Sequence, residues 1–246
     1  MSNQLNGKIA LVTGGSRGIG AAIVRRLARD GATVAFTYAA ADERAQALVR
    51  EIAEAGGTAL PIKADSADVE ALQAAVAQAA QRFGRIDILV NNAGILLRGV
   101  VDDYPLADFD RMVAVNVRAV FAAVQAVLPH MGQGGRVITT GSVTADRAGF
   151  PGASVYSMTK GAVAALTRGL ARDLGPRGIT VNAVQPGPTE TDMNAGAEMH
   201  AMLSSLMALG RIGKDSEIAS LVAYLASAEA GFITGAALTA DGGYLA

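Results

Sequence analysis

A glycine-rich turn near the amino terminus, between an apolar run and a helical pattern, constrains the fold more than any other stretch. Ile9–Val12 is wholly apolar, as expected of a strand buried on both faces of a parallel sheet. Thr13–Gly20 follows, and apolar residues then recur at helical spacing through Leu27. The glycines of the turn, spaced G-x-x-x-G-x-G, are Gly14, Gly18 and Gly20. Glycine lets the backbone approach a ligand closely, and a helix amino terminus attracts phosphate. The pattern predicts a dinucleotide-binding crossover; for the motif alone, an ordinary turn that needs glycines is the alternative.

Composition narrows the possible classes of protein. The chain has 246 residues, of which 51% are apolar and 17% charged, and this predicts one domain, residues 1–246, with a large core. A net charge of -1 argues against a nucleic-acid partner. There is no cysteine, and only His130 and His200 could supply imidazole, so we expect no metal site.

Nothing in the sequence is typical of an export or membrane segment. The amino-terminal MSNQLNGK lacks the charged-then-apolar layout of a signal peptide. The longest uncharged run, Ala119–Gly135, contains polar residues and falls short of the ~20 apolar residues that a membrane span needs. We therefore expect a cytoplasmic protein without a membrane partner.

Strand and helix patterns alternate along the whole chain. Further strands are predicted at Thr33–Tyr38, Ala59–Lys63, Asp87–Asn91, Arg136–Thr140, Thr180–Val184 and Ala237–Ala240. Further helices are predicted at Asp42–Ala55, Asp68–Phe83, Leu106–Pro129, Val155–Leu174 and Glu217–Ala226. Repeated βα units imply an α/β fold, a doubly wound parallel sheet of Rossmann type with about seven strands and helices on both faces. Ligands bind such sheets at the carboxyl ends of the strands.

The residues after the second strand bear on which dinucleotide binds. An acidic residue there would hydrogen-bond the adenosine ribose 2′-hydroxyl, but Tyr38 is followed by Ala39–Ala41. Asp42 comes later and is interpreted as a helix cap. Arg17, in the glycine turn, suits a 2′-phosphate, with a solvated loop charge as the alternative. The pattern favours NADP(H) over NAD(H).

Polar residues also follow the next two strands. Asp65 and Ser66 either meet an adenine edge or cap the helix that starts near Asp68. After the fourth strand, the chain reads Asn91, Asn92, Ala93 and Gly94. Small and amide residues in a row suit backbone approach to a ribose, although a simple polar turn would use the same residues.

A catalytic group is predicted at the end of the fifth strand and the start of the next helix. Tyr156 and Lys160 are four residues apart, so both project from one helix face, and Ser142 ends the facing strand. A free tyrosine titrates near ~10, and a neighbouring cation lowers that pKa by roughly 1–3 units, as a general acid/base requires. Ser142 can then bind the substrate oxygen. A Y-x-x-x-K pair by itself is more often an exposed helical pair.

Jointly these residues resemble the short-chain dehydrogenase/reductase family, over essentially the whole chain. The resemblance is carried by Thr13–Gly20, Asn91–Gly94, Asn116, Ser142, Tyr156, Lys160, Pro186, Gly187, Thr189 and Thr191. It implies that Tyr156 protonates a carbonyl oxygen during reduction, or acts as the base in oxidation, while Ser142 orients the carbonyl. Lys160 would lower the Tyr156 pKa and bind the nicotinamide ribose, and Asn116 would hold a water that relays protons to Lys160. The nicotinamide transfers the hydride, so no metal is required.

The same resemblance implies a cofactor site. Pro186 and Gly187 would line the nicotinamide, with the Thr189 backbone and Thr191 hydroxyl reaching its carboxamide, and Arg17 matches a basic position of NADP(H)-dependent members. The predicted cofactor-binding residues are Gly14, Ser16, Arg17, Gly18, Ile19, Gly20, Tyr38, Asp65, Ser66, Asn92, Ala93, Gly94, Tyr156, Lys160, Pro186, Gly187, Thr189 and Thr191.

The chain departs from the family pattern in two places. The interval from Ser142 to Tyr156 is one residue longer than in most members, which predicts an unusual substrate wall at Val143–Val155. Fatty-acid-synthesis reductases are basic where acyl carrier protein docks, whereas Leu128–Gly135 has no lysine or arginine. Arg168 and Arg172 remain, so half of the expected patch is missing, and a carrier-protein substrate is disfavoured.

The segment 191–211 is rich in methionine and leucine: Met193, Met199, Met202, Leu203, Leu206, Met207 and Leu209. It predicts either an adaptable apolar lid or the core of a short helix. With Leu96, Leu97, Val143 and Phe150 as possible neighbours, we expect a hydrophobic or aromatic ketone or secondary alcohol as substrate. The alternatives are a 3-oxoacyl-[acyl-carrier-protein] reductase and a low-turnover nucleotide-binding regulator.

The predicted helices Leu106–Pro129 and Val155–Leu174 carry apolar or small residues on more than one face. Such helices must be buried on two sides, which predicts a subunit interface. Family resemblance implies a homotetramer, with the tail Gly235–Ala246 supporting a second interface.

Overall fold

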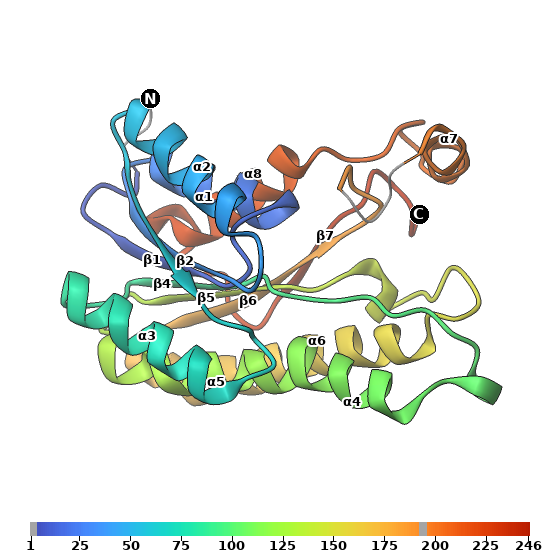
Figure 1. Cartoon of the computed structure of the whole chain (residues 1–246), viewed down its shortest axis with the longest axis horizontal. Coiled ribbons are helices and arrows are strands. Elements are labelled where there is room, and N and C mark those ends of the chain that lie inside the picture. Colours follow the sequence, from blue (N-terminus) through green and yellow to red (C-terminus); the bar gives the residue numbers. More distant parts are fainter. Residues whose placement is uncertain (1–3, 192–195) are drawn as a thin grey trace.

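The computed structural model describes residues 4–191 and 196–246. The strands are β1 (Ile9–Val12), β2 (Thr33–Tyr38), β3 (Thr58–Lys63), β4 (Ile88–Asn91), β5 (Arg136–Thr140), β6 (Thr180–Pro186) and β7 (Ala237–Ala240). The helices are α1 (Gly18–Arg29), α2 (Asp42–Glu54), α3 (Val69–Phe83), α4 (Leu106–Val113), α5 (Ala119–Val127), α6 (Ser154–Leu174), α7 (Ala197–Ser205) and α8 (Asp215–Ala226). Figure 1 shows the sheet between two layers of helices, with α1, α2 and α8 on one face and α3, α4, α5 and α6 on the other.

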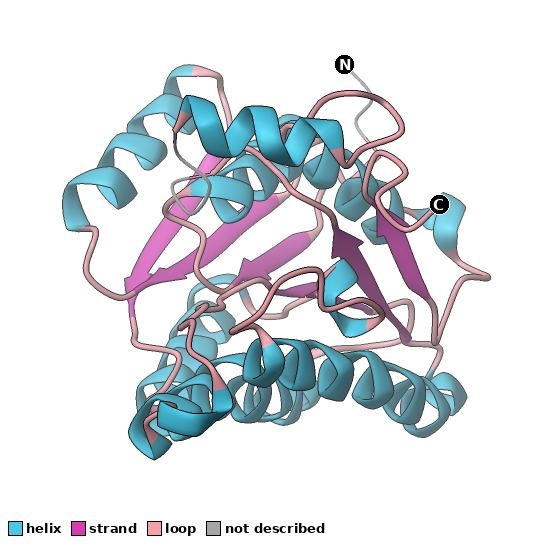
Figure 2. Ribbon diagram, turned by 90° about the vertical axis from the view of Figure 1, so that its right-hand side faces the viewer, coloured by secondary structure: helices cyan, strands magenta, loops and turns pink. Residues whose placement is uncertain are grey.

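The strands form one seven-stranded sheet in the order β3-β2-β1-β4-β5-β6-β7. Every neighbouring pair is parallel. The strand order reverses between β1 and β4, and in open α/β sheets a ligand crevice forms at such a reversal. The predicted α/β fold, a doubly wound sheet of Rossmann type with helices on both faces, is confirmed (Figure 2).

The apolar strands hold the two helix layers together because successive side chains point to opposite faces. In β1, Ala10 and Val12 belong to the buried cluster under α1 and α8, whereas Leu11 belongs to the cluster on the side of α3 and α5. A strand that supplies core to both faces must be apolar throughout, which is why these strands are short continuous hydrophobic runs.

The predicted helix Leu106–Pro129 is interrupted by a turn that the sequence did not predict. Residues Ala114–Arg118 form a π-helical turn between α4 and α5, and the Ala119 N–H donates to the Ala114 carbonyl. One extra residue in a single turn changes the hydrophobic periodicity too little to be detected, so the sequence pattern predicts one continuous helix. Single π turns inside α-helices are frequent at functional sites, and this one contains Asn116.

The same helical run, Leu106–His130, has the length and hydropathy of a membrane span, with 25 residues and a mean hydropathy of 1.6. Half of its apolar window is buried, and Ala119, Val124 and Val127 belong to the cluster shared with α3 and α6. Packing against the sheet therefore accounts for its apolar character.

Two predictions about helix caps are corrected. Ala41, not Asp42, occupies the cap position of α2, and the Asp42 carboxylate instead accepts hydrogen bonds from Lys63 Nζ (3.0 Å) and the Tyr38 hydroxyl (3.1 Å). Asp65 and Ser66 do not cap α3, because Asp68 does so by accepting the Ala71 N–H at 3.0 Å. Asp42 thus lies inside α2, one residue past its cap position, and Asp68 is the residue that caps α3.

Candidate active site

A cavity of about 710 Å³ lies along the carboxyl ends of β1 to β6. All of the predicted cofactor-binding residues line it, as do Ser142, Tyr156 and Lys160. Leu97 and Asn91 do not line it. The Leu97 N–H donates to the Met112 sulfur, and the buried Asn91 amide has no hydrogen-bond partner among the described residues.

The glycine turn between β1 and α1 is held by hydrogen bonds from β4. Thr13 Oγ1 accepts the N–H groups of Asn92 (3.0 Å) and Ala93 (3.1 Å). The Asn92 amide donates to the carbonyls of Thr13 (3.1 Å) and Gly14 (3.0 Å). Asn92 therefore ties the ends of two neighbouring strands together, and its amide is a scaffold for the turn.

Gly20 is required by close packing. A Cβ on Gly20 would lie 2.2 Å from the Gly14 carbonyl oxygen and 2.5 Å from Asn92 Nδ2, so no side chain fits between helix and turn. The start of α1 has neither a capping side chain nor an acidic residue in its first turn. A helix end with uncapped N–H donors and no nearby carboxylate suits a diphosphate, so the turn fits a dinucleotide.

The end of the cavity at β2 and β3 is basic. Tyr38, Ala39, Ala40 and Ala41 form its wall, and Arg17 and Arg44 line it. No acidic residue follows β2 before Asp42, whose carboxylate is occupied by Lys63 and Tyr38. Burial, and then the hydrogen bond to Asp42, raise the pKa of Tyr38. Arg44 was not predicted from the sequence. It lies in the first turn of α2, three residues after Ala41, and this spacing could have indicated that it reaches the cavity.

Asp65 and Ser66 line the same end of the cavity. Asp65 accepts the Ala67 N–H at 2.9 Å and pairs with Arg111 at 2.9 Å. The backbone bond, and then the pair with Arg111, keep the pKa of Asp65 below its usual range. The carboxylate is therefore fixed and charged, at a place where an adenine edge would meet it.

Ser142, Tyr156 and Lys160 converge at the far end of the cavity. Ser142 directly follows Gly141 at the end of β5, and its hydroxyl shares a hydrogen bond with the Tyr156 phenol. Tyr156 lies in the first turn of α6, and the Lys160 ammonium sits 5.5 Å from the centre of its ring. Lys160 Nζ donates to the Thr140 carbonyl at 2.8 Å. The predicted proximity of the three side chains is confirmed.

The expected lowering of the Tyr156 pKa is not found in this structure. Burial raises the pKa of Tyr156 to about 12, and the hydrogen bond with Ser142 only partly opposes it. Burial also lowers the pKa of Lys160 to about 8. The cation that should favour the phenolate is itself desolvated and bonded to a backbone carbonyl, so the cost of burial outweighs the attraction. Burial thus shifts both pKa values in the direction that favours the neutral form, and such perturbed pKa values are typical of catalytic sites.

Asn116 occupies the π-helical turn and is 2% exposed. Its amide donates to the Ile95 carbonyl (2.9 Å) and to Thr159 Oγ1 (3.1 Å), and its oxygen accepts the Ile95 N–H (2.9 Å). All polar atoms of this side chain are thus engaged, and it fixes the chain beside Gly94 and Lys160. The amide oxygen has a second lone pair that could accept a water, and the expected water relay stays a prediction.

Pro186, Gly187, Thr189 and Thr191 line the cavity after β6. A Cβ on Gly187 would lie 2.7 Å from the Asp241 α-carbon, so the chain passes tightly under the carboxyl-terminal tail. Thr191 approaches the glycine turn from the opposite side, since its methyl would be 3.5 Å from a Cβ on Gly18.

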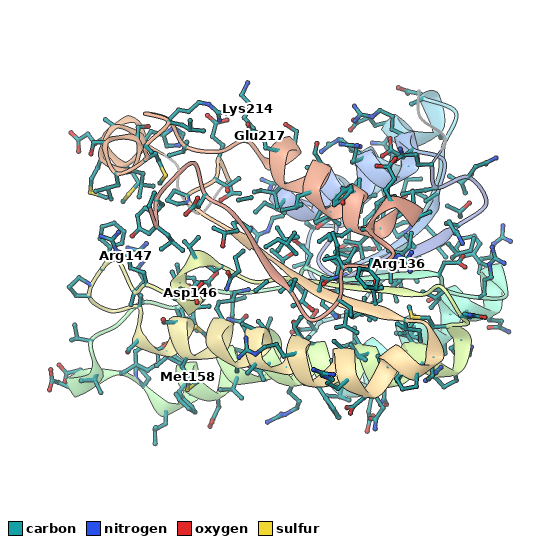
Figure 3. The ribbon with its side chains drawn as sticks, turned by 180° about the vertical axis from the view of Figure 1, so that it is seen from behind. Arg136, Asp146, Arg147, Met158, Lys214 and Glu217 are labelled. Carbon is teal, nitrogen blue, oxygen red and sulfur yellow. The ribbon has the colours of Figure 1, made fainter. Side chains whose placement is uncertain are left out.

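The wall beyond Ser142 is apolar and comes from several segments. Its members are Ile95, Leu96, Val143, Phe150, Leu203 and Tyr244. Val143, Met207 and Tyr244 form a small buried cluster that joins the loop after β5 to the segment around α7 and the tail. Arg147, on that loop, donates to the Tyr244 carbonyl at 3.1 Å and stacks on its ring; Figure 3 shows it on the side of the tail.

The methionine-rich segment divides into two parts. Leu203 and Met207 are buried, as expected of a wall, whereas Met199, Met202, Leu206 and Leu209 are exposed. Met193 lies outside the described residues.

Tyr244 and Arg98 line the cavity and were missed by the sequence reasoning, because neither stands directly after a strand.

Known proteins are similar to this chain over nearly its whole length. The family profile described as "Enoyl-(Acyl carrier protein) reductase" matches residues 14–245. The chain is 46% identical over 239 residues to the cyclic-di-GMP-binding biofilm dispersal mediator protein of Escherichia coli K12, covering 97% of each. It is 40% identical over 254 residues to a versicolorin reductase of Emericella nidulans, covering 98% of this chain and 96% of that protein.

Solved structures agree with these relatives. A short-chain dehydrogenase/reductase from Serratia marcescens is 59% identical, with a TM-score of 0.97, covering 99% of this chain and 100% of that one. A short chain dehydrogenase from Burkholderia cenocepacia in complex with NADP is 53% identical, with a TM-score of 0.96 and the same coverage. A parallel doubly wound sheet with this glycine turn and a serine, tyrosine and lysine at one cavity defines a nucleotide-dependent oxidoreductase. The chain belongs to the short-chain dehydrogenase/reductase family.

Proposed function

We propose that the protein is an NADP(H)-dependent enzyme that interconverts an apolar or aromatic ketone and its secondary alcohol. The observation that carries this proposal is the convergence of Ser142, Tyr156 and Lys160 on a cavity that joins the glycine turn to an apolar wall. When bound, the nicotinamide supplies or accepts the hydride.

The side chains then have separate tasks in reduction. Tyr156 holds the proton that the carbonyl oxygen receives, and with a pKa of about 12 it is protonated at neutral pH. Ser142 orients the same oxygen by a hydrogen bond. Lys160 Nζ lies 5.5 Å from the centre of the Tyr156 ring. There it would bind the hydroxyls of the nicotinamide ribose and stabilise the phenolate that remains after proton transfer. Asn116 is a positioning residue, because it fixes Ile95 and Thr159 around Lys160.

The preference for NADP(H) rests on charge at the β2 end of the cavity. Arg17 and Arg44 line that end, and Asp42 is already paired with Lys63. A 2′-phosphate would therefore meet guanidinium groups, and the nearby carboxylates of Asp42 and Asp65 are already paired with Lys63 and Arg111. The Burkholderia relative, which was crystallised with NADP, supports the same preference. The residues proposed to hold the cofactor are those predicted from the sequence, from Gly14 to Thr191, together with Arg44.

The apolar wall supports a ketone with a hydrophobic body. The relative from Emericella nidulans is named a versicolorin reductase, which is consistent with a reductase activity. Docking of an acyl carrier protein is disfavoured because Leu128–Gly135 offers no lysine or arginine. A regulator with little turnover is the second candidate, and the Escherichia coli relative named for cyclic di-GMP binding favours it.

Oxidation of NADPH with matched substrates tests the proposal. We expect a higher kcat/KM for an aromatic ketone such as acetophenone than for an acetoacetyl thioester of acyl carrier protein, and a higher kcat/KM with NADPH than with NADH. Preference for the thioester would establish the carrier-protein reductase instead. Absence of turnover together with tight binding of cyclic di-GMP, measured calorimetrically, would establish the regulator.

We further infer a homotetramer in the cytoplasm. Phe121 on α5 and Met158 on α6 remain 49% and 44% exposed, and Figure 3 shows Met158 on the outer face of α6. Large exposed apolar side chains on neighbouring helices are typical of a subunit interface. Light scattering at micromolar concentration should give the mass of four chains, and charged substitutions at both positions should lower it. A monomer for the wild-type chain would contradict this inference.

A further inference from the structure

The cavity carries more positive charge than the proposed cofactor requires. Among the described residues that line it, the cations are Arg17, Arg44, Arg98, Arg111 and Lys160, and the sole anion is Asp65. Arg111 pairs with Asp65, and Lys160 donates to the Thr140 carbonyl. Arg17 and Arg44 lie at the end proposed for the 2′-phosphate. No cofactor contact or ion pair has been assigned to Arg98.

Arg98 stands at the substrate end, on a backbone that is fixed on both sides. It follows Gly94 by four residues, and a Cβ on Gly94 would lie 3.6 Å from Lys160 Nζ. The Leu97 carbonyl accepts the Tyr104 hydroxyl at 3.0 Å, and the Gly99 N–H donates to the Gly152 carbonyl at 3.1 Å. The loop after β4 is thereby attached to the loop after β5, and Figure 1 shows both loops at the carboxyl end of the sheet.

The Arg98 guanidinium has no hydrogen bond or ion pair with any residue in 4–191 or 196–246. Its side chain is exposed, and the same cavity has an apolar wall that includes Phe150 and Leu203. The charged residues of the facing loop, Asp146 and Arg147, do not line the cavity. An unpaired guanidinium at the edge of an apolar wall is suited to bind a carboxylate through two parallel hydrogen bonds.

We propose that the preferred substrate is a ketone whose apolar or aromatic body bears a carboxylate, which Arg98 binds at the rim of the cavity. The inference rests on the proposed function, since it places the carbonyl at Ser142 and Tyr156. It adds that Arg98 determines specificity without taking part in the proton transfer. Exposed ion pairs change affinity a few-fold, and the adjoining apolar wall strengthens them, so we expect roughly a tenfold preference.

The test uses two probes of nearly the same shape, 4-acetylbenzoate and its neutral amide, 4-acetylbenzamide. For the wild-type enzyme with NADPH, we expect a higher kcat/KM for the carboxylate, with a difference that shrinks as sodium chloride is added. In Arg98→Gln the preference should fall by roughly tenfold, through loss on the carboxylate alone, and Arg98→Lys should restore part of it. Arg29→Gln, which removes an exposed arginine at the far end of α1, should behave as wild type.

A binding measurement separates this inference from the proposed function. Calorimetric affinities of both probes for the complex with NADP⁺ give the contribution of Arg98 whether or not turnover occurs. Equal affinity for the two probes in the wild-type enzyme, or a preference that Arg98→Gln leaves unchanged, would overturn the role of Arg98. Turnover of the amide would in that case still uphold the ketone reductase. Absence of turnover with every ketone, despite selective binding of the carboxylate, would instead refute the proposed function.

Discussion

Tyr156→Phe is expected to reduce kcat for ketone reduction by roughly 10²–10⁴-fold, the range that a lost general acid produces. The substitution removes one oxygen atom and leaves the ring in place beside Lys160. The lysine keeps its bond to the Thr140 carbonyl, so the ribose end of the site should remain intact. Affinity for NADPH, measured from its fluorescence, should therefore change little. NADPH absorbance at saturating ketone measures the rate.

Tyr224→Phe is the matched control for this experiment. Tyr224 lies on α8, is 39% exposed and does not line the cavity, so loss of its hydroxyl should leave the rate unchanged. A Tyr156→Phe enzyme that kept a rate comparable to that of the control would show that another group supplies the proton. An equal fall in rate and NADPH affinity would mean that the phenol serves cofactor binding and not proton transfer.

The sequence predicted those features that depend on local order along the chain. The central strands are largely apolar because both sheet faces are covered, and four strands, Ile9–Val12, Thr33–Tyr38, Arg136–Thr140 and Ala237–Ala240, have the predicted bounds. The glycine turn was recognisable because close packing between helix and strand excludes any side chain. The spacing of Tyr156 and Lys160 placed both on one helix face, as the structure has them.

Features that depend on distant partners could not be predicted in this way. Asp42 is the first residue of α2, one position past the cap, and its carboxylate binds Lys63 on β3, a residue distant in the sequence. Leu97 and Arg98 are adjacent, yet only Arg98 lines the cavity, and the Leu97 backbone is bonded to Met112 and Tyr104, which follow it in the chain. Tyr244 reaches the cavity because β7 returns the tail to Val143 and Met207. The high pKa of Tyr156 likewise follows from burial, which the spacing of residues along the sequence does not predict.

Gly20→Ala is expected to weaken the binding of NADPH. The new methyl group would lie 2.2 Å from the Gly14 carbonyl oxygen and 2.5 Å from Asn92 Nδ2, neither of which can give way without breaking the bond between them. The start of α1 must then move off the turn and away from a bound diphosphate. We expect a loss of affinity of roughly tenfold or more (about 1.4 kcal/mol) and, from overpacking, a loss of stability of about 1–3 kcal/mol.

Gly169→Ala tests whether this effect belongs to the turn. Gly169 lies on α6 with nothing within 4 Å of its would-be Cβ, so alanine there should slightly stabilise the helix and leave NADPH affinity unchanged. Thermal unfolding without cofactor measures stability, and NADPH fluorescence measures affinity on the fraction that is folded. If Gly20→Ala lowered the melting temperature but bound NADPH as tightly as Gly169→Ala, the turn would be a packing element alone. The cofactor would then have to be held by residues other than the amino terminus of α1, and the proposed site would be wrong at its centre.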